Sequence, residues 1–565
     1  MAVCRSFLLL VALFLADACQ AEIMVRNGQD LIGIANSAPP GETLIVSPGT
    51  YAGGTLTNRV TIRFAETSGH AKFRSGVSVQ ADGVTLEGLT WAEMDGQLLE
   101  IRASNVTVRR CQFRLFGLDE GVAAKAIWIR EDAAYNNTLI EDSLFEDWGN
   151  PTEHSSCIKV SQLDGAQPTG TVIRNNLFRD GVVGGNNVAV QLFAPTLVEG
   201  NEIYFVEDGI EVKGSGSTIR GNLLHHNFGY EQLSNRSGSN NLFENNIVHD
   251  TQGPMAWVAE GSNIVYRNNL FFHNGDGMRL TGLVPDKYAQ ITNIQIVNNV
   301  FYDNVRELTT DSRQTDPPQQ ISLLNNAFAY GSLEGSADAI ANADFNLYYQ
   351  TSPANRGAHD LVGVDPQFVD ANAGNFRLLP TSPLIDAGTS LPVGAVDFDG
   401  IPRDEKWDIG PFEFVRLFRE ELDLNGDHQV NRDDLYVACE SGDKRTTLAV
   451  LTLLGSLPGD ADLDGRVNFS DFVLVARNFS TSGATFTQGD LDCDQQVQFA
   501  DFNLLAGYFG QSYGSLELKF HAVRNLAREA FGSAQAVPEP SRTAWWRLGP
   551  LVSAIWLRRT GDRRM

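Results

Sequence analysis

Residues 219–248, IRGNLLHHNFGYEQLSNRSGSNNLFENNIV, contain the pattern that decides the fold. Two similar phrases, IRGNLL (219–224) and FENNIV (243–248), each place an asparagine inside a short apolar segment. These asparagines are Asn222 and Asn246. Related phrases recur along the chain, and their equivalent residues are Leu89, Cys111, Ser143, Asn176, Asn201, Asn222, Asn246, Asn269, Asn299 and Asn326.

The equivalent residues are 21 to 33 positions apart, a spacing typical of solenoids in which each repeat forms one coil. Short β-branched segments and loops of variable length predict a right-handed parallel β-helix, with equivalent residues stacked about 4.8 Å apart. Asparagine recurs at one corner because its side-chain amide can bond the coils above and below. Leucine-rich repeats are the competing interpretation, but their L-x-x-L-x-L signature is absent.

The open ends of a solenoid must be covered. Leu31, Ile32, Ile34 and Ala35 predict an amphipathic helix that caps the first coil. At the other end, residues 362–414 break the period and are expected to close the coil stack. We therefore predict an all-β domain, with its caps, over residues 22–415.

Composition and the N-terminus narrow the possible partners and location. The 565 residues carry a formal net charge of −26, which makes nucleic acid a poor partner. An anionic ligand would need a local basic pocket. Arg5, the apolar run FLLLVALFL and the small residues after it predict a signal peptide over residues 1–21. We therefore expect a secreted protein, or one on the bacterial outer surface.

The cysteines that follow this segment are Cys111, Cys157, Cys439 and Cys493. They are far apart and form no C-x-x-C pair, so the sequence indicates neither a zinc site nor a disulfide scaffold. The stability of the fold is therefore expected to come from burial of apolar side chains.

Three acidic loops follow the β-helix. DLNGDHQVNRDD (423–434), DADLDGRVNFSD (460–471) and DLDCDQQVQFAD (490–501) have the alternate spacing of a calcium loop, and each is followed by an amphipathic segment. An aspartate at position 12 and the following helix resemble dockerin repeats, which implies a helical module over residues 416–515 with a cohesin-like or cell-surface partner. The predicted Ca²⁺ ligands are Asp423, Asn425, Asp427, Gln429, Asp434, Asp460, Asp462, Asp464, Asp471, Asp490, Asp492, Asp494 and Asp501.

The end of the chain resembles a sorting signal. After a linker at residues 516–536, residues 537–565 combine Pro-Glu-Pro, a short apolar stretch and an arginine-rich end. This order resembles the PEP-CTERM signal, which implies transient membrane association during delivery to the cell surface.

Two cations occupy similar places on neighbouring repeats. Lys213 lies 12 residues past Asn201, and Arg236 lies 14 past Asn222, so both should stack on one face of adjacent coils. Like charges so close are unfavourable unless an anion lies between or above them. This placement indicates a site for an acidic ligand. The alternative is a pair of surface cations bridged to Glu211 or Glu231.

The phrases around these cations, EDGIEVKGSGSTIRGN (207–222) and LSNRSGSNNLFENN (233–246), resemble the central coils of polysaccharide lyase family 6, the chondroitinase B and alginate lyase group. The resemblance implies that Lys213 is the catalytic base and Arg236 the acid, acting on an acidic polysaccharide such as alginate or a glycosaminoglycan. The residues after the two cations, glycine and serine here, differ from the family's serine and histidine. The resemblance also implies a Ca²⁺ site at Glu207 and Asp208.

The chemistry of β-elimination suits this pair. The C5 proton of a uronate is weakly acidic, so a cation must neutralise the neighbouring carboxylate as charge develops. A lysine acts as the base only when its amine is neutral, a form that a neighbouring cation such as Arg236 favours. The predicted substrate contacts are Tyr230, Trp257, His225 and Glu260.

Two other functions fit a β-helix. A glycoside hydrolase requires a close pair of carboxylates, and the sequence shows no convincing pair around the Lys213 coil. A non-catalytic glycan-binding or cell-surface protein would have no need of Lys213.

Overall fold

The computed structural model describes residues 22–66, 68–119, 121–162, 168–229, 231–280, 291–310, 319–335, 340–352, 356–414 and 422–509. The predicted signal peptide, linker and sorting tail lie outside these residues. Within them, no helix is both long and apolar enough to cross a bilayer.

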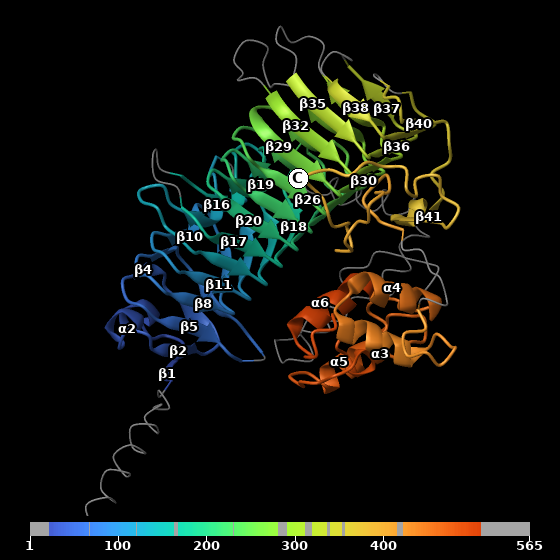
Figure 1. Ribbon diagram of the computed structural model, residues 1–565. Coiled ribbons are helices and arrows are strands. Elements are labelled where there is room, and N and C mark those ends of the chain that lie inside the picture. The colour runs from blue at the N-terminus through green and yellow to red at the C-terminus, as the bar shows by residue number, and fades with distance from the viewer. Residues whose placement is uncertain are drawn as a thin grey trace, which may run out of the picture.

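The chain winds into a long solenoid of three parallel sheets, because every third strand joins the same sheet (Figure 1). The predicted right-handed parallel β-helix is confirmed. The strands of sheet A are β1 (Ile23–Val25), β2 (Thr43–Val46), β5 (Thr61–Phe64), β8 (Thr85–Glu87), β11 (Thr107–Arg109), β14 (Leu139–Glu141), β17 (Thr171–Arg174), β20 (Thr196–Glu199), β23 (Thr218–Arg220), β26 (Leu242–Glu244), β29 (Gly261–Arg267), β32 (Ile291–Val297), β35 (Gln319–Leu324) and β38 (Ile340–Asp344).

The strands of the other two sheets, B and C, follow one another in the same way. Those of sheet B are β3 (Gly49–Tyr51), β6 (Ala71–Phe73), β9 (Thr90–Met94), β12 (Gln112–Phe116), β15 (Leu144–Trp148), β18 (Leu177–Gly181), β21 (Glu202–Tyr204), β24 (Leu223–His225), β27 (Ile247–His249), β30 (Leu270–Phe272), β33 (Val300–Tyr302), β36 (Ala327–Ala329), β39 (Leu347–Tyr349) and β40 (Leu361–Val362). Those of sheet C are β4 (Gly54–Leu56), β7 (Val77–Val79), β10 (Gln97–Ile101), β13 (Lys125–Ile129), β16 (Ser156–Val160), β19 (Val188–Leu192), β22 (Asp208–Val212), β25 (Leu233–Asn235), β28 (Pro254–Val258), β31 (Asp276–Leu280), β34 (Arg306–Thr310) and β37 (Ser332–Glu334).

The predicted asparagine ladder is confirmed at the corner between sheets A and B. Each side-chain NH₂ group donates to the amide oxygen of the next coil, as from Asn222 to Asn246 and from Asn246 to Asn269, both at 3.0 Å. The same oxygen also accepts a backbone N–H. Every coil is thereby fixed in register with the next. The members of the ladder are Asn176, Asn201, Asn222, Asn246, Asn269, Asn299, Asn326 and Asn346.

Apolar columns fill the interior. Phe73, Trp91, Phe113, Phe145 and Phe178 stack with ring centroids 4.6 to 4.9 Å apart. On the outer face of sheet A, by contrast, acidic and basic residues alternate from coil to coil. Stacking therefore pairs opposite charges where the surface meets water, and buries matched rings inside.

The N-terminal cap has the predicted form. Helix α2 (Leu31–Ser37) begins after Asp30, whose carboxylate accepts the Gly33 amide at 3.0 Å. Its buried residues Leu31, Ile32 and Ala35 join the core of the first coils.

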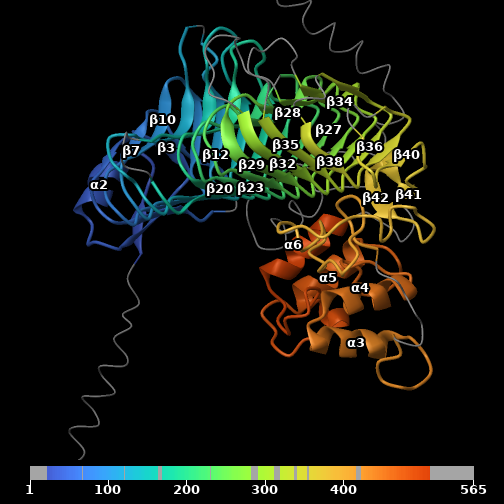
Figure 2. The same cartoon turned by 45° about the horizontal axis from the view of Figure 1, so that its top comes forward.

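The segment after β40 does not close the coil stack in the predicted way. Its antiparallel strands β41 (Phe368–Asp370) and β42 (Asn375–Leu378), joined by the 3₁₀ turn η2 (Ala371–Ala373), lie beside the C-terminal coils (Figure 2). Their apolar residues, such as Phe376, pack on the outer face of sheet B, from Leu223 to Leu347. The segment is a lateral cover, because these outward positions of sheet B are apolar and need burial.

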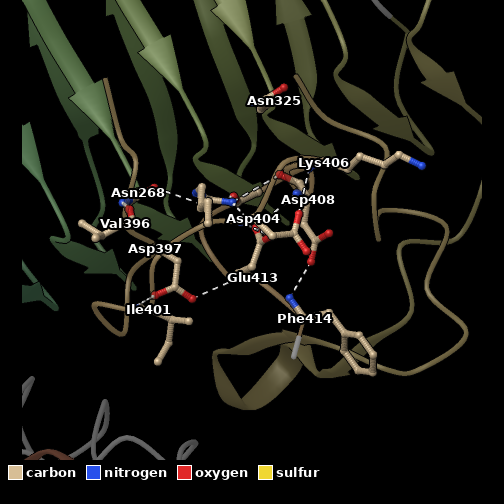
Figure 3. A network of polar contacts seen from close by, with 12 residues as sticks. Asn268, Asn325, Val396, Asp397, Ile401, Asp404, Lys406, Asp408, Glu413 and Phe414 are labelled. Atoms are coloured by element: carbon tan, nitrogen blue, oxygen red, sulfur yellow. Dashed lines mark hydrogen bonds and ion pairs between the residues drawn. The ribbon is translucent and has the colours of Figure 1, made fainter. Parts of the chain in front are cut away.

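Buried charges fasten this cover. Arg403 donates to Glu413 at 3.1 Å and to Asn268 at 3.3 Å. Asn268, which precedes the ladder residue Asn269, donates in turn to the Val396 carbonyl (Figure 3). Asp397 accepts the Glu413 amide at 3.0 Å.

A helical part follows the cover, with α3 (Arg432–Ser441), α4 (Lys444–Leu453), α5 (Phe469–Arg477), η3 (Phe486–Gln488) and α6 (Phe499–Tyr508). It has an apolar core of its own. Cys439 and Cys493 form a disulfide there, although the sequence does not indicate a disulfide scaffold. Sequence spacing missed the bond because packing of α3 against the third loop, 54 residues later, brings the two cysteines together.

Replacing Asn246 by alanine should lower the free energy of unfolding by about 2 to 4 kcal/mol, because the Ile219 carbonyl and the Asn222 amide lose buried partners. Urea unfolding measures the change. The matched control is Asn342→Ala on exposed β38, which should change stability by less than about 0.5 kcal/mol. Equal effects of the two variants would contradict a structural role for the ladder.

Candidate functional site

The two predicted cations stack on adjacent coils. Val212 pairs with Asn235 in sheet C, and Lys213 and Arg236 are the residues that directly follow them. The Lys213 amide donates to the Leu192 carbonyl, and the Arg236 amide to the Val212 carbonyl. The spacing from the asparagine corner therefore predicts their relative position correctly.

Both side chains line a cleft of about 440 Å³ on sheet C. Its other lining residues include His154, Trp257 and Arg279. The Arg236 guanidinium lies over the Trp257 ring, 4.9 Å from its centre. The cleft thus offers cations, an aromatic ring and a histidine to one ligand.

Glu211 lies between the two cations. Its carboxylate is 2.9 Å from the Lys213 amine and 3.6 Å from Nε of Arg236. Arg236 also forms an ion pair with Glu231. The alternative of bridged cations is therefore present in the structure, although the bridge lies inside a cleft and not on an open surface.

Carboxyl groups with raised pKa values form one wall of the cleft. Burial, together with the charges of Glu231 and Glu207, raises the pKa of Asp208 to about 8. Burial and the charge of Glu211 raise the pKa of Glu231 to about 7, although Arg236 and Lys213 oppose the rise. The sequence shows no convincing carboxylate pair around the Lys213 coil, but the structure places three carboxyl groups in this cleft. Asp208, Glu211 and Glu231 line one cleft because they come from neighbouring coils.

A hydrogen-bonded chain links the cleft histidine to the acidic wall. Gln191 Nε2 donates to Glu211 at 2.6 Å and contacts Nε2 of His154 at 3.0 Å. An amide nitrogen only donates, so Nε2 of His154 accepts and bears the lone pair. Sequence reasoning missed His154 because it lies in the irregular loop before β16, where no repeat position marks it.

More cations continue along sheet C toward the N-terminus. Around the Trp128 ring lie Arg130 at 3.5 Å, Lys125 at 5.0 Å and Lys159 at 5.6 Å from its centre. Burial is the largest factor that lowers the pKa of Lys125 and of Lys159. The Phe193 ring lies within 5.5 Å of both Lys159 and Lys213, which connects this group to the cleft.

The remaining predicted substrate contacts do not all lie in the cleft. Trp257 lines the cleft as expected. His225 does not, because it ends β24 on sheet B, only three residues past the Asn222 corner. Glu260 follows β28, and its backbone carbonyl accepts from Asn235; its side chain is not among the cleft residues. Tyr230 lies outside the described residues.

The predicted Ca²⁺ pair at the cleft does not fit. The Glu207 carboxylate accepts the Asn187 backbone amide at 2.8 Å and belongs to a turn. Asp208 accepts the Glu231 amide at 3.0 Å. Within the described part of the chain, no three carboxylates of this cleft bring ligand oxygens within 4.8 Å of one another.

The calcium-loop residues converge better. In the second and third loops, Asp460, Asp462 and Asp464, and likewise Asp490, Asp492 and Asp501, bring one oxygen each within 4.8 Å. Helices α3, α5 and α6 begin inside the three loops, near position 10. The buried position-12 residues Asp434, Asp471 and Asp501 accept the amide of position 9 in each loop.

In the first loop, as in the other two, the position-1 aspartate accepts backbone amides of the loop itself. Asp423 accepts the backbone amides of Asp427 and His428 at 2.9 and 2.7 Å. The amide group of Asn425 donates to Asp427 at 3.4 Å. Gln429 supplies position 7, and Asp494 supplies position 5 of the third loop, where it accepts from Gln498.

The comparison with protein families supports the fold. A family described as the right-handed β-helix region matches residues 166–328. A search of curated proteins finds no match. Among solved structures, a PL6 family alginate lyase is 17% identical with a TM-score of 0.43, covering 63% of this chain and 55% of its own.

Two further structures show the same level of similarity. A PL6 family polysaccharide lyase from Pseudopedobacter saltans is 14% identical with a TM-score of 0.41, over 64% of this chain and 97% of its own. The A-module of a mannuronan C-5 epimerase from Azotobacter vinelandii is 14% identical with a TM-score of 0.33, over 59% and 90%. This chain spans just over half the length of the first of these structures. The functional proposal therefore rests on the residues of the cleft.

The acidic wall should make stability fall as pH rises. Asp208 and Glu231 have folded pKa values of about 8 and about 7, above their ordinary values of 3.8 and 4.5. From about pH 4 to pH 8 the folded chain therefore binds more protons than the unfolded chain, and this contribution is lost as pH rises. Asp208→Asn should flatten the pH dependence of urea unfolding, whereas the exposed Glu405→Gln should leave it unchanged. A wild-type slope retained in Asp208→Asn would contradict the assignment.

Proposed function

We propose that this protein is a polysaccharide lyase that cleaves a uronate-containing polymer, such as alginate or a glycosaminoglycan, by β-elimination. The observation that carries the proposal is the stacking of the Lys213 amine and the Arg236 guanidinium on adjacent coils of one cleft. The two groups can reach neighbouring atoms of a single sugar ring because coils are about 4.8 Å apart.

The charge pattern supports an anionic substrate. The chain as a whole is strongly acidic, yet cations follow one another on sheet C from Lys125 through Lys159 to Arg279. Trp128, Phe193 and Trp257 lie among them and can stack on sugar faces. A polymer lying along the solenoid axis would meet both kinds of group on successive residues.

The reaction needs three functions from the cleft. Lys213 takes the C5 proton, and the electron pair of that bond forms the C4–C5 double bond as the C4–oxygen bond breaks. Arg236 and Arg279 neutralise the uronate carboxylate while charge develops on it. The departing oxygen receives a proton from the Arg236–Glu231 pair, in which the pKa of Glu231, about 7, leaves a carboxyl proton available near neutral pH.

Glu211 gives the cleft a resting state. It holds the Lys213 amine at 2.9 Å while no substrate carboxylate is present. An incoming uronate brings its own negative charge to the same cations, and competes with Glu211 for them. As Lys213 leaves Glu211, it also transfers one proton to the Glu211 carboxylate, so that the neutral amine is free to take the C5 proton.

A glycoside hydrolase is the second candidate, and the three cleft carboxylates favour it. Glu231 with its raised pKa could act as the acid, and Glu211 as the base or nucleophile. Hydrolysis differs from elimination in its product, since it leaves no double bond. A protein that only binds glycans would yield no product.

The decisive assay incubates the protein with alginate, chondroitin and pectate and follows both the ultraviolet absorbance of unsaturated uronate and new reducing ends. Elimination should produce both signals, and Lys213→Ala should lower kcat by about a thousandfold because the base is lost. The matched control is Lys406→Ala, an exposed lysine of the C-terminal cover, which should retain full activity. Reducing ends without the absorbance would establish hydrolysis, and full activity in Lys213→Ala would contradict the proposed base.

We also propose that the helical part binds calcium and attaches the exported enzyme to a cohesin-like or cell-surface partner. The convergence of aspartates in the second and third loops supports two Ca²⁺ ions. The sorting tail would deliver the protein to the bacterial surface, with transient membrane contact on the way.

A chelator-competition titration with Ca²⁺ should therefore find two tight sites. Asp464→Asn should remove one of them, since it deletes a converging carboxylate of the second loop. Asp427→Asn, the equivalent change in the first loop, is the control and should leave both sites intact. Three equal sites, or the loss of a tight site in Asp427→Asn, would overturn this assignment.

A further inference from the structure

A second cluster of chemically active side chains lies at the turn between sheets B and C. Four of the nine histidines in the chain lie on three successive coils there: His225, His226, His249 and His273. His226, His249 and Asp250 each bring one ligand atom within 4.8 Å of the others. None of the three lines the lyase cleft.

The backbone explains how the cluster forms. The turn residues His226, Asp250, His273 and Asp303 all have left-handed backbone conformations, with φ between 51° and 56°. They occupy equivalent places on consecutive coils, since the His226 amide donates to the His249 carbonyl and the His273 amide to the Tyr302 carbonyl. Histidine and aspartate therefore alternate along one ridge.

A hydrogen-bonded chain sets the tautomer of His226. In its neutral form the His225 ring carries one N–H. Its Nε2 contacts the Glu202 carboxylate at 3.2 Å and donates to it, because a carboxylate only accepts. Its Nδ1 therefore accepts from Nδ1 of His226 at 2.8 Å. This leaves Nε2 of His226 as the nitrogen that bears the lone pair.

His249 is oriented in a similar way. Without a metal, its Nδ1 donates to the Asp250 carboxylate at 2.8 Å, and a metal ion bound by these two residues would take the place of that proton. In His226, by contrast, the second ring nitrogen donates to a neighbouring acceptor, as it does in histidines that bind metals.

The cluster is reachable from solvent. The side chains of His249 and Asp250 are 17% and 30% exposed. Asp250, His273 and Asp303 line an open hollow of about 610 Å³ beside it. An ion can therefore enter, and water can complete its coordination.

We propose that His226, His249 and Asp250 bind a divalent transition-metal ion, with zinc the favoured ion, that fastens two consecutive coils together. Two imidazoles and one carboxylate with a water molecule make a four-coordinate zinc site. Ca²⁺ and Mg²⁺ prefer oxygen ligands only, so the site is distinct from the acidic loops of the helical part. Glu231 of the cleft wall follows His226 by five residues, so the metal also steadies the turn that leads into the cleft.

The test uses the full-length protein with excess Ca²⁺, which keeps the acidic loops occupied, and titrates Zn²⁺ against a chromophoric chelator. We expect one tight Zn²⁺ per chain and a zinc-dependent rise in Tm. His226→Gln and His249→Gln should weaken binding at least a hundredfold and abolish the rise. Glu202→Gln should weaken it about tenfold, because it disturbs only the chain that orients His226. The visible spectrum of bound Co²⁺ should show nitrogen ligands in the wild type and lose them in the double variant.

Two further variants make the outcome decisive. His359→Gln is the matched control, since His359 forms a similar surface pair with Asp344 at 2.8 Å and should leave zinc binding unchanged. Asp250→Asn keeps the shape of the turn, so a loss of binding in this variant with an unchanged circular dichroism spectrum would support the site even if a histidine variant fails to fold. Absence of zinc binding in the wild type, or equal binding in Asp250→Asn and wild type, would overturn the proposal.

Discussion

The structure depends on the amide-to-amide hydrogen bonds of the asparagine ladder. Each ladder residue bonds a side chain on one side and a backbone amide on the other, so one coil can neither slide nor rotate against the next. In a parallel β-helix this constraint extends along the whole solenoid, because each strand pairs residue by residue with the strands of the coils before and after it. Every chemical feature of the surface is consequently a column of equivalent positions.

These columns determine which charged side chains lie next to one another on neighbouring coils. On sheet A, Arg109, Arg174, Arg220 and Arg267 each form an ion pair, at 2.7 to 2.8 Å, with a glutamate on the preceding coil. Alternation of this kind satisfies each charge within the sheet. Sheet C lacks this alternation, since Lys213 stacks on Arg236. The glutamates that pair with these two cations lie beside the column and not within it. A ligand can displace a partner placed at the side more readily than one placed within the stack.

The same columns explain which predictions from sequence succeed. Counting from Asn201 and Asn222 placed Lys213 and Arg236 together, because both lie at the end of a sheet C strand before any long loop intervenes. Counting from the asparagine corner failed for His225, because a residue three positions after Asn222 still lies in a strand of sheet B. The repeat thus predicts an angle around the coil only when the number of residues to each turn is known.

Features outside the repeat could not be read in this way. His154 enters the cleft from a loop of irregular length, and the Cys439–Cys493 bond depends on how helices pack. The C-terminal cover packs on apolar residues of the outer face of sheet B. In the sequence these residues look like core residues, because the apolar pattern does not show which face of the sheet is covered. Packing between segments distant in the chain decides these features.

The acidic wall of the cleft is best understood together with the cations opposite it. Two basic groups alone would attract any polyanion, and would hold it whether or not it could react. With Glu211 already bound to Lys213 and Arg236, an anion gains only the difference between its own contacts and those it displaces. A ligand with a carboxylate at the right spacing, and rings that stack on Trp257, recovers more than a simple anion does. The buried carboxylates therefore lower affinity in general, and selectivity for a ring-borne carboxylate follows from that cost.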